Sequence, residues 1–170
     1  INQAWTKIQS SRKWNFLWKA STFNTVIGQN LYDPVENLAL NPVLDSWSGV
    51  RYEGLELPCI LWDNFSRVAP ASGKPASYTI RPDNVLQFDA LPDAVYTYSF
   101  EYYREPQVLV AGTDVPLIAA QHHQVILYQA MLYLAAEQDA PEIQRDALYR
   151  FERLMSSMRM SRSSFTGLGG

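Results

Sequence analysis

The feature that most constrains the fold is the apolar segment between Pro116 and Gln138. From Val125 onward, apolar side chains point in nearly every direction around a helix axis instead of forming one stripe. Pro116 suits the first position of a helix, and the Asp114 carboxylate would lie near the positive helix end, so we predict one helix over 116–138. A chain with one small core covers about two sides of such a helix. We therefore expect another subunit to cover the rest.

The rival interpretation of an apolar helix is a membrane span. Polar residues interrupt the segment at Gln121, His122, His123, Gln124 and Gln129. They leave a continuous apolar stretch of about twelve residues, whereas a bilayer span needs roughly 20. We therefore expect no membrane as a partner.

The composition points in the same direction as the apolar helix. Only 18% of the 170 residues are charged, while 13% are aromatic, which is more aromatic surface than a solitary domain of this size needs. This excess favours a protein that buries aromatic side chains against partners. Cys59 is the only cysteine, so we expect neither a disulfide scaffold nor a cysteine metal cluster.

Charge is distributed unevenly along the chain, although the net charge is only −3. Residues 1–20 hold four Lys or Arg and no acid, and residues 142–162 hold five Arg against three acids. Residues 33–114 hold twelve acids against five Lys or Arg, a net charge of −7. The pattern indicates either an ordinary solvated surface or an acidic module that DNA passes without binding, because an acidic surface repels phosphate.

Both ends of the chain have helical periodicity. Four apolar residues near the start follow the spacing of one helix face: Ile1, Ala4, Trp5 and Ile8. A second amphipathic helix is predicted from about residue 142 to residue 160, and its short connection to the apolar helix predicts antiparallel packing of the two. Residues 161–170 have no helical pattern, so we expect this tail to order only against a partner.

Residues 20–110 have the short β-branched and aromatic runs that are typical of strands. Three hairpins are predicted around Gly, Pro, Asn or Asp turns: 21–27 with 30–32, 49–52 with 55–57, and 77–81 with 85–88. Aromatic residues alternate with polar ones over 96–103, which predicts a half-buried antiparallel strand. A turn of helix is expected within 58–65.

The order of these elements predicts an α+β fold. We expect a helical bundle, made of the N-terminal helix and the C-terminal antiparallel helix pair, with a large antiparallel β insertion. The predicted helical domain with its C-terminal tail comprises residues 1–20 and 111–170, and the inserted β domain comprises residues 21–110.

No catalytic motif is present in the sequence, because it has no Gly-rich phosphate loop, nucleophile elbow or zinc-protease signature. His122 and His123 are the only histidines. As neighbours on a helix they would point about 100° apart, so they cannot readily bind one metal ion. We therefore predict no enzyme, no cofactor and no catalytic or metal-binding residue.

Aromatic residues of the β segment allow one other class of function. They would either stack on sugar rings, as in a carbohydrate-binding β module, or fill a small sandwich core. The candidates are Trp47, Tyr52, Trp62 and Tyr78.

Several loose patterns follow one another in an order that covers nearly the whole chain. They are Ile1-Asn2-Gln3-Ala4-Trp5 and Arg12-Lys13-Trp14-Asn15-Phe16-Leu17, then Arg104-Glu105-Pro106 after the aromatic strand, Thr113-Asp114-Val115-Pro116 before the apolar helix, and His123, Ala130, Tyr149 and Leu154. In this order the sequence resembles the head-to-tail adaptor, or neck, proteins of tailed bacteriophages. In such adaptors a further helix usually precedes the first one here, so we expect residues to be missing before Ile1.

The resemblance implies a structural virion protein, made in the host cytoplasm and placed in the neck between capsid and tail. It implies a homo-oligomeric connector ring, commonly a dodecamer of about twelve copies, beneath the portal protein. The ring would join the portal to tail or nozzle proteins and line the DNA channel, passing DNA without sequence-specific binding. A phage tail-completion or tube protein is the alternative within the same class.

Two sets of site residues follow as hypotheses. Portal docking is assigned to the C-terminal helix and tail, with the β insertion facing the tail or nozzle. The docking residues are Arg150, Arg153, Arg159, Arg162, Phe165 and Leu168. The inter-subunit residues of the apolar helix are Ile126, Tyr128, Met131 and Tyr133.

Overall fold

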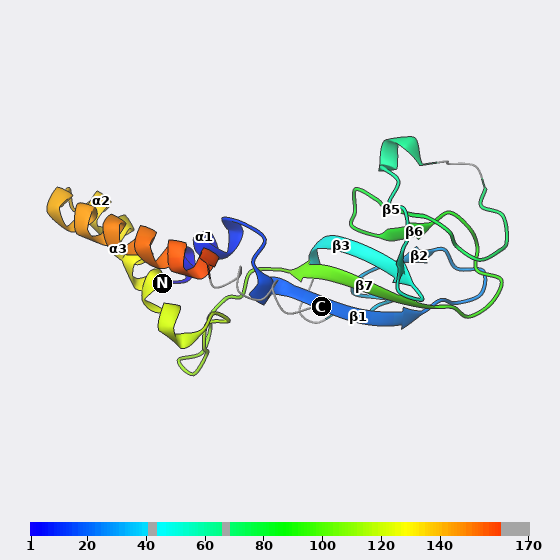
Figure 1. Ribbon diagram of the computed structural model, residues 1–170, viewed down its shortest axis with the longest axis horizontal. Coiled ribbons are helices and arrows are strands. Elements are labelled where there is room, and N and C mark those ends of the chain that lie inside the picture. The colour runs from blue at the N-terminus through cyan, green and yellow to red at the C-terminus, as the bar shows by residue number, and fades with distance from the viewer. Residues whose placement is uncertain (41–43, 66–68, 161–170) are drawn as a thin grey trace. The chain divides into compact units, whose positions relative to one another are not determined.

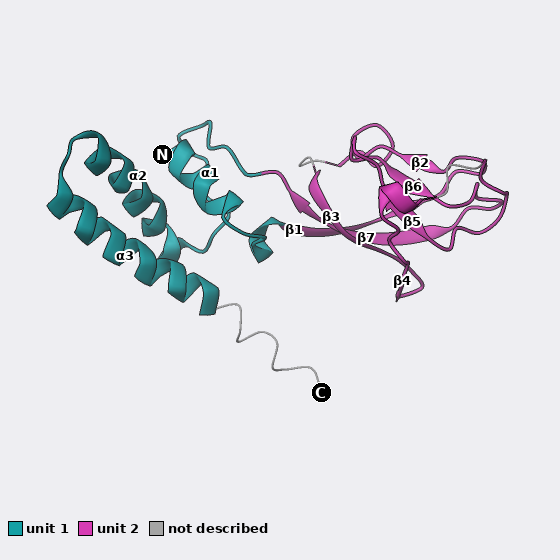
Figure 2. Cartoon of the chain, turned by 90° about the horizontal axis from the view of Figure 1, so that it is seen from above, with its two compact units in different colours: residues 1–17, 106–170 teal, residues 18–105 magenta. Residues whose placement is uncertain are grey.

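The computed structural model describes residues 1–40, 44–65 and 69–160, and the chain divides into two compact units (Figures 1 and 2). The helical unit comprises Ile1–Leu17 and Pro106–Gly170. The β unit comprises Trp18–Glu105, so it lies within the helical unit in sequence.

The β unit contains two antiparallel sheets (Figure 1). The first has the strand order β1-β7-β3-β4, with β1 at Trp18–Asn24, β7 at Thr97–Arg104, β3 at Leu44–Tyr52 and β4 at Leu55–Glu56. The second has the order β2-β6-β5, with β2 at Leu31–Tyr32, β6 at Leu86–Phe88 and β5 at Tyr78–Ile80. Trp62–Asn64 forms a single 3-10 turn, η2, where a turn of helix was expected within 58–65.

Aromatic side chains from both sheets share one hydrophobic core. On β7, Tyr98, Phe100 and Tyr102 are buried, because alternate residues of a strand point to the same face. The ring of Tyr98 lies 4.8 Å from that of Phe88 on β6, and this contact joins the two sheets. The prediction of a half-buried aromatic strand is therefore confirmed.

Two of the three predicted hairpins are confirmed. Strands β5 and β6 pair as expected around 81–85, and β3 pairs with β4. The β3–β4 turn contains Glu53 and Gly54 with φ of +50° and +81°, the left-handed conformation of a tight two-residue hairpin turn.

The predicted hairpin of 21–27 with 30–32 is wrong. Strand β1 pairs with β7 and β2 pairs with β6, so the two segments belong to different sheets. The backbone around Gly28 bonds to a distant segment, since the N–H of Gly28 donates to the Pro92 carbonyl and the N–H of Thr25 donates to the Tyr96 carbonyl. Long-range strand pairing outweighed the local turn signal.

The helical unit consists of α1 (Asn2–Ser10), α2 (Gln124–Glu137) and α3 (Pro141–Met160), with 3-10 turns η1 (Asn15–Leu17) and η3 (Ala120–His122). Helix α2 packs against both α1 and α3 (Figure 2). Residues Gln138–Ala140 connect α2 to α3 directly, and the two helices form the expected antiparallel pair. Helix α1 buries Ala4, Trp5 and Ile8 as its spacing predicted, while Ile1 is exposed.

The predicted helix over 116–138 is wrong in its first third, because α2 begins only at Gln124. The preceding segment has other hydrogen-bond partners. The Asp114 carboxylate accepts hydrogen bonds from the backbone N–H groups of Val110 (2.6 Å) and Ala111 (2.8 Å), and these bonds hold the pKa of Asp114 below its usual value. The side-chain oxygen of Gln107 accepts a bond from the N–H of Leu117 (3.1 Å). The Asp114 bonds close a turn before Pro116, the Gln107 bond engages the N–H of Leu117, and Ala119 has a non-helical ψ of 142°, so no helix forms over 116–119.

The predicted fold class, a helical bundle with a β insertion, also needs correction. The protein is mixed α+β with a β-rich core, because the contiguous hydrophobic core lies between the two sheets of the β unit. Helix α2 packs against α1 and α3 and buries Val125, Ile126 and Ala135, while Leu127 and Leu134 stay exposed.

Candidate functional site

Helix α2 has an apolar face that the other described residues of the helical unit do not cover. Leu127 and Leu134 are 50% and 51% exposed, and they lie seven residues apart, which places them on one side of the helix. Met131 lies between them on the same side and is half-buried. We call Leu127, Met131 and Leu134 the open face of α2. Covering these two leucines with a partner would remove apolar surface from water.

The structure separates the four predicted inter-subunit residues. Ile126 is only 5% exposed and is buried within the helical unit. Tyr128 and Met131 are half-buried, and Tyr133 is 37% exposed. Sequence reasoning missed Leu127 and Leu134, since an all-round apolar helix gives no stripe that tells covered from uncovered sides.

A groove of about 520 Å³ runs between α2 and α3, and we call it the basic groove. Its walls include Tyr128 of α2 and Tyr149, Arg150 and Arg153 of α3. The Arg150 guanidinium lies 5.9 Å from the centre of the Tyr128 ring, and its Nε donates a 2.9 Å bond to Asp146. That bond, with a further one to Tyr128, raises the pKa of Arg150, so this arginine stays charged at any ordinary pH.

Two predicted docking residues meet in this groove. Arg150 and Arg153 both line it, and Arg153 makes no ion pair among the residues that the structure describes. Arg159 lines a different pocket, near the end of α3. Arg162, Phe165 and Leu168 lie outside the described residues. The groove therefore offers one paired and one unpaired cation beside two tyrosine rings, a surface that suits an acidic partner segment.

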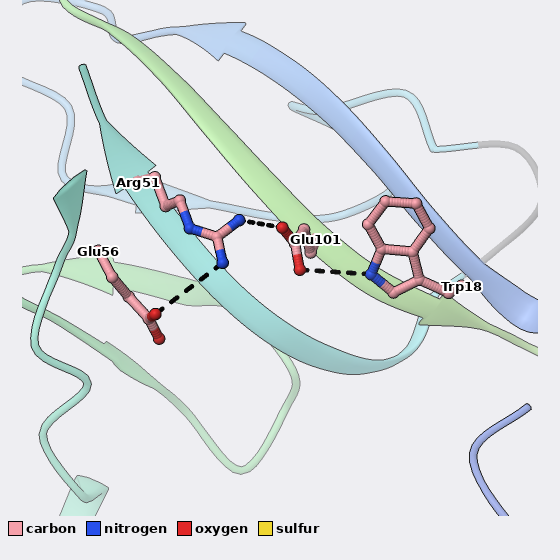
Figure 3. A network of polar contacts seen from close by, with 4 residues as sticks. All are labelled: Trp18, Arg51, Glu56 and Glu101. Atoms are coloured by element: carbon pink, nitrogen blue, oxygen red, sulfur yellow. Dashed lines mark hydrogen bonds and ion pairs between the residues drawn. The ribbon is translucent and has the colours of Figure 1, made fainter. Parts of the chain in front are cut away.

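The outer face of the first sheet carries a polar network drawn from all four strands (Figure 3). Glu101 of β7 accepts hydrogen bonds from Arg51 of β3 and from the indole N–H of Trp18 of β1 (3.3 Å). Arg51 also lies 3.9 Å from the carboxylate of Glu56 on β4. The bond to Glu101 raises the pKa of Arg51. The network connects neighbouring strands, and its groups have the chemistry of a structural ion pair.

The aromatic residues considered for sugar stacking do not form a common platform. Tyr78 is buried in the β core. Trp47 packs on Phe100, and its indole N–H donates a 3.0 Å bond to the Asn84 carbonyl. The ring of Tyr52 is covered by the Lys74 ammonium at 3.6 Å. These rings are engaged by the protein itself.

A comparison of the sequence with protein-family models identifies the family of the chain. The family model described as SU10 adaptor protein matches residues 1–168. The chain belongs to the SU10 adaptor protein family. This confirms the resemblance to phage head-to-tail adaptors and makes the protein a phage structural component of the head-to-tail junction that associates with other head or tail proteins. A search of curated proteins finds no match to the chain.

The histidines and the possible metal ligands of the described residues do not come together in one site. His122 is buried and His123 bonds the Ile118 carbonyl through Nε2 (3.0 Å), so the two histidines have separate surroundings. Over residues 1–40, 44–65 and 69–160, no group of three His, Cys, Asp or Glu side chains is placed to hold a metal ion. None of the helices in these ranges has the length and apolar character to cross a bilayer.

Proposed function

We propose that this adaptor forms a homo-oligomeric ring, commonly of about twelve copies, that joins the capsid portal to the tail and lines the DNA channel. The observation that supports it is the open face of α2. Helix α2 already packs against α1 and α3, and Leu127 and Leu134 remain half-exposed. A neighbouring copy would bury them, and a head-to-tail contact repeated around an axis closes a ring.

The size of the open face predicts when the ring forms. Covering a half-exposed leucine stabilises a contact by about 1 kcal/mol, because full burial of a leucine contributes about 1.5–3 kcal/mol. Two such residues do not offset the several kcal/mol of motional freedom that association removes. The isolated adaptor should therefore be monomeric and should form its ring on a template.

The portal is the proposed template, and the basic groove with the end of α3 is the proposed docking surface. Arg150 and Arg153 line the groove. The proposed docking surface also includes four residues nearer the chain end: Arg159, Arg162, Phe165 and Leu168. Deleting residues 161–170 should leave the melting temperature unchanged and abolish portal binding. Portal binding by the truncated adaptor would reject this assignment.

The β unit is proposed to face the tail or nozzle. It carries eleven Asp or Glu against six Lys or Arg, a net charge of −5, so its field repels passing DNA. Reversing the exposed charges of Glu36 and Asp63 to Lys should block tail joining while portal binding continues. Lost portal binding with intact tail joining would reverse the assignment.

Native mass spectrometry tests the proposed function as a whole. The adaptor would be measured alone and after mixing with a purified portal ring. We expect a monomer alone and a complex of about twelve adaptors on one portal, in line with closed cyclic symmetry. A portal that binds single adaptors without further copies at saturating concentration would contradict the ring.

A further inference from the structure

A second pocket of the helical unit shares only Arg159 with the residues named for portal docking. It has a volume of about 310 Å³, within the usual range of ligand pockets, and lies between the segment after α1, the segment before α2 and the end of α3. Apolar side chains form much of its wall, among them Trp14, Phe16, Leu117, Ile118 and Met158. We call it the aromatic pocket.

The aromatic wall of this pocket is fixed by its own packing. Trp14 is buried, and its indole N–H donates a 2.8 Å bond to the carbonyl of Ile8 at the end of α1. The ring of Phe16 stacks on Trp14 at 5.6 Å and on Trp5 at 5.7 Å. A wall held in this way exists before any ligand arrives, which lowers the ordering cost of binding.

The charged groups of the pocket are all basic. Arg12 and Arg159 line it, and its lining includes no Asp or Glu. The Arg12 guanidinium lies over the Trp14 ring at 5.1 Å. Neither arginine forms an ion pair with a carboxylate among the described residues. The pocket therefore combines an apolar interior with two cations available to an anion.

His122 adds a buried ring nitrogen, Nδ1, that has no hydrogen-bond partner among the described residues. It lines the pocket and is 8% exposed. Its Nε2 lies 3.2 Å from the side-chain amide nitrogen of Gln121, and its buried Nδ1 has no hydrogen-bond partner among the described residues. With the Gln121 amide as donor, Nε2 accepts and Nδ1 carries the proton. A buried N–H without an acceptor is unfavourable, so His122 is a polar residue whose hydrogen-bonding capacity the described residues leave incomplete.

We propose that the aromatic pocket binds a segment of another virion protein in which an aromatic or long aliphatic side chain stands next to a carboxylate. The apolar wall holds the side chain, and the guanidinium groups of Arg12 and Arg159 donate hydrogen bonds to the carboxylate. The volume corresponds to roughly ten water molecules, enough for one such side chain with its acid group. Charge complementarity selects this occupant over an uncharged or basic segment.

Two peptides that differ only in charge test the proposal. They are acetyl-Asp-Phe-Glu-Leu-amide and its neutral counterpart acetyl-Asn-Phe-Gln-Leu-amide, titrated into the 15N-labelled full chain. The indole N–H signal of Trp14 reports on the pocket wall. We expect the acidic peptide to shift this signal and to bind at least about tenfold more tightly than the neutral one, because hydrogen bonds between ionised partners are roughly twice as strong as neutral ones.

Matched arginine variants locate the binding site. Arg12→Gln and Arg159→Gln should each weaken binding of the acidic peptide about tenfold and leave the neutral peptide unaffected. Arg145→Gln is the control, because Arg145 is exposed on the first part of α3 and pairs with Glu142. Equal loss with the control variant, or equal affinity of the two peptides, would overturn the proposal.

Two further outcomes would assign the pocket to another occupant and thereby also overturn it. Binding that begins only after residues 161–170 are deleted would identify the chain's own tail as the occupant. A Trp14 signal that moves with adaptor concentration in the absence of peptide would identify a second copy. Each outcome leaves the ring proposal to its own test, because that proposal depends on Leu127 and Leu134, which are not part of the pocket.

Discussion

The two units of this adaptor differ in how far each completes its own surface. The β unit encloses the rings of Phe88, Tyr98 and Phe100 between its two sheets, exposes Leu55 and Leu61, and carries a net charge of −5. The helical unit carries eight Lys or Arg against six acids, a net charge of +2, and leaves leucines, a basic groove and an aromatic pocket uncovered by the described residues. This difference supports the proposal that the partner-binding surfaces lie on the helical unit.

The largest expected effect is the loss of an aromatic ring from the β core. Phe88→Ala removes a side chain with no exposed surface, so we expect the free energy of unfolding to fall by about 3–5 kcal/mol. Leu134→Ala on the open face should lower it by less than about 1 kcal/mol, because its side chain is already half in water. Urea unfolding followed by circular dichroism measures both. Similar losses would remove the distinction between the units.

The second prediction concerns assembly instead of folding. Leu127→Glu together with Leu134→Glu should leave the monomer folded and prevent ring formation on the portal, since the charges would have to be buried between copies. Leu55→Glu with Leu61→Glu is the matched control, because these leucines of the β unit are also exposed. Native mass spectrometry with portal measures the copy number. Full rings from the first variant would show that the open face is not an interface.

The third prediction addresses the basic groove. Arg150→Glu with Arg153→Glu should weaken portal binding at least about tenfold and reduce its salt dependence, because charged rim contacts act through screened electrostatics. Arg145→Glu, an exposed change elsewhere on α3, should have little effect. Titration by interferometry at two salt concentrations provides the affinities. A response to Arg145→Glu as large as that of the groove variant would indicate a nonspecific charge effect.

A smaller effect is expected for the polar network of the β unit. Glu101→Gln leaves Arg51 without its closest anionic partner, and we expect a small loss in the free energy of unfolding, because solvent screens the pair. Trp18→Phe removes only the 3.3 Å indole contact and should have a smaller effect. Urea unfolding measures both variants. A larger loss for Trp18→Phe would show that ring packing, not the ion pair, connects β1 to the sheet.

The smallest effect is a pH dependence from Asp114. Its pKa is lower in the folded chain than the ordinary 3.8, because two backbone N–H groups donate to the ionised carboxylate. The resulting stabilisation is therefore present above pH 3.8 and is lost as the pH falls through the lower folded value. An NMR titration should place the pKa of Asp114 below 3.8, and Asp114→Asn should remove this part of the acid sensitivity. A pKa at or above the ordinary value would contradict the turn.

The sequence predicted most of what depends on short-range periodicity. Alternation over 96–103 identified a strand and its buried face, and the apolar spacing of residues 4–8 identified the buried side of α1. The patterns failed where contacts between residues far apart in the sequence determine the local structure. The predicted helix start failed because the Gln107 side chain accepts the N–H of Leu117 and Ala119 has a non-helical ψ of 142°.

The candidate site was less accessible from sequence for a related reason. A helix that is apolar on all sides shows that it needs cover, but which side stays open depends on where α1 and α3 pack. That is why Ile126 was selected although it is buried, and why Leu127 and Leu134 were missed. The family, by contrast, follows from the order of many weak patterns, which does not depend on any single orientation.

Covalent footprinting of α2 tests the central claim most directly. The adaptor would be labelled with a carbene reagent as a free chain and within intact virions, and labelling at Leu127 and Leu134 would be compared by mass spectrometry. We expect strong labelling of both leucines in the free chain and its loss in the virion, with Leu55 on the β unit as an exposed reference. Unchanged labelling of Leu127 and Leu134 in the virion would contradict the account.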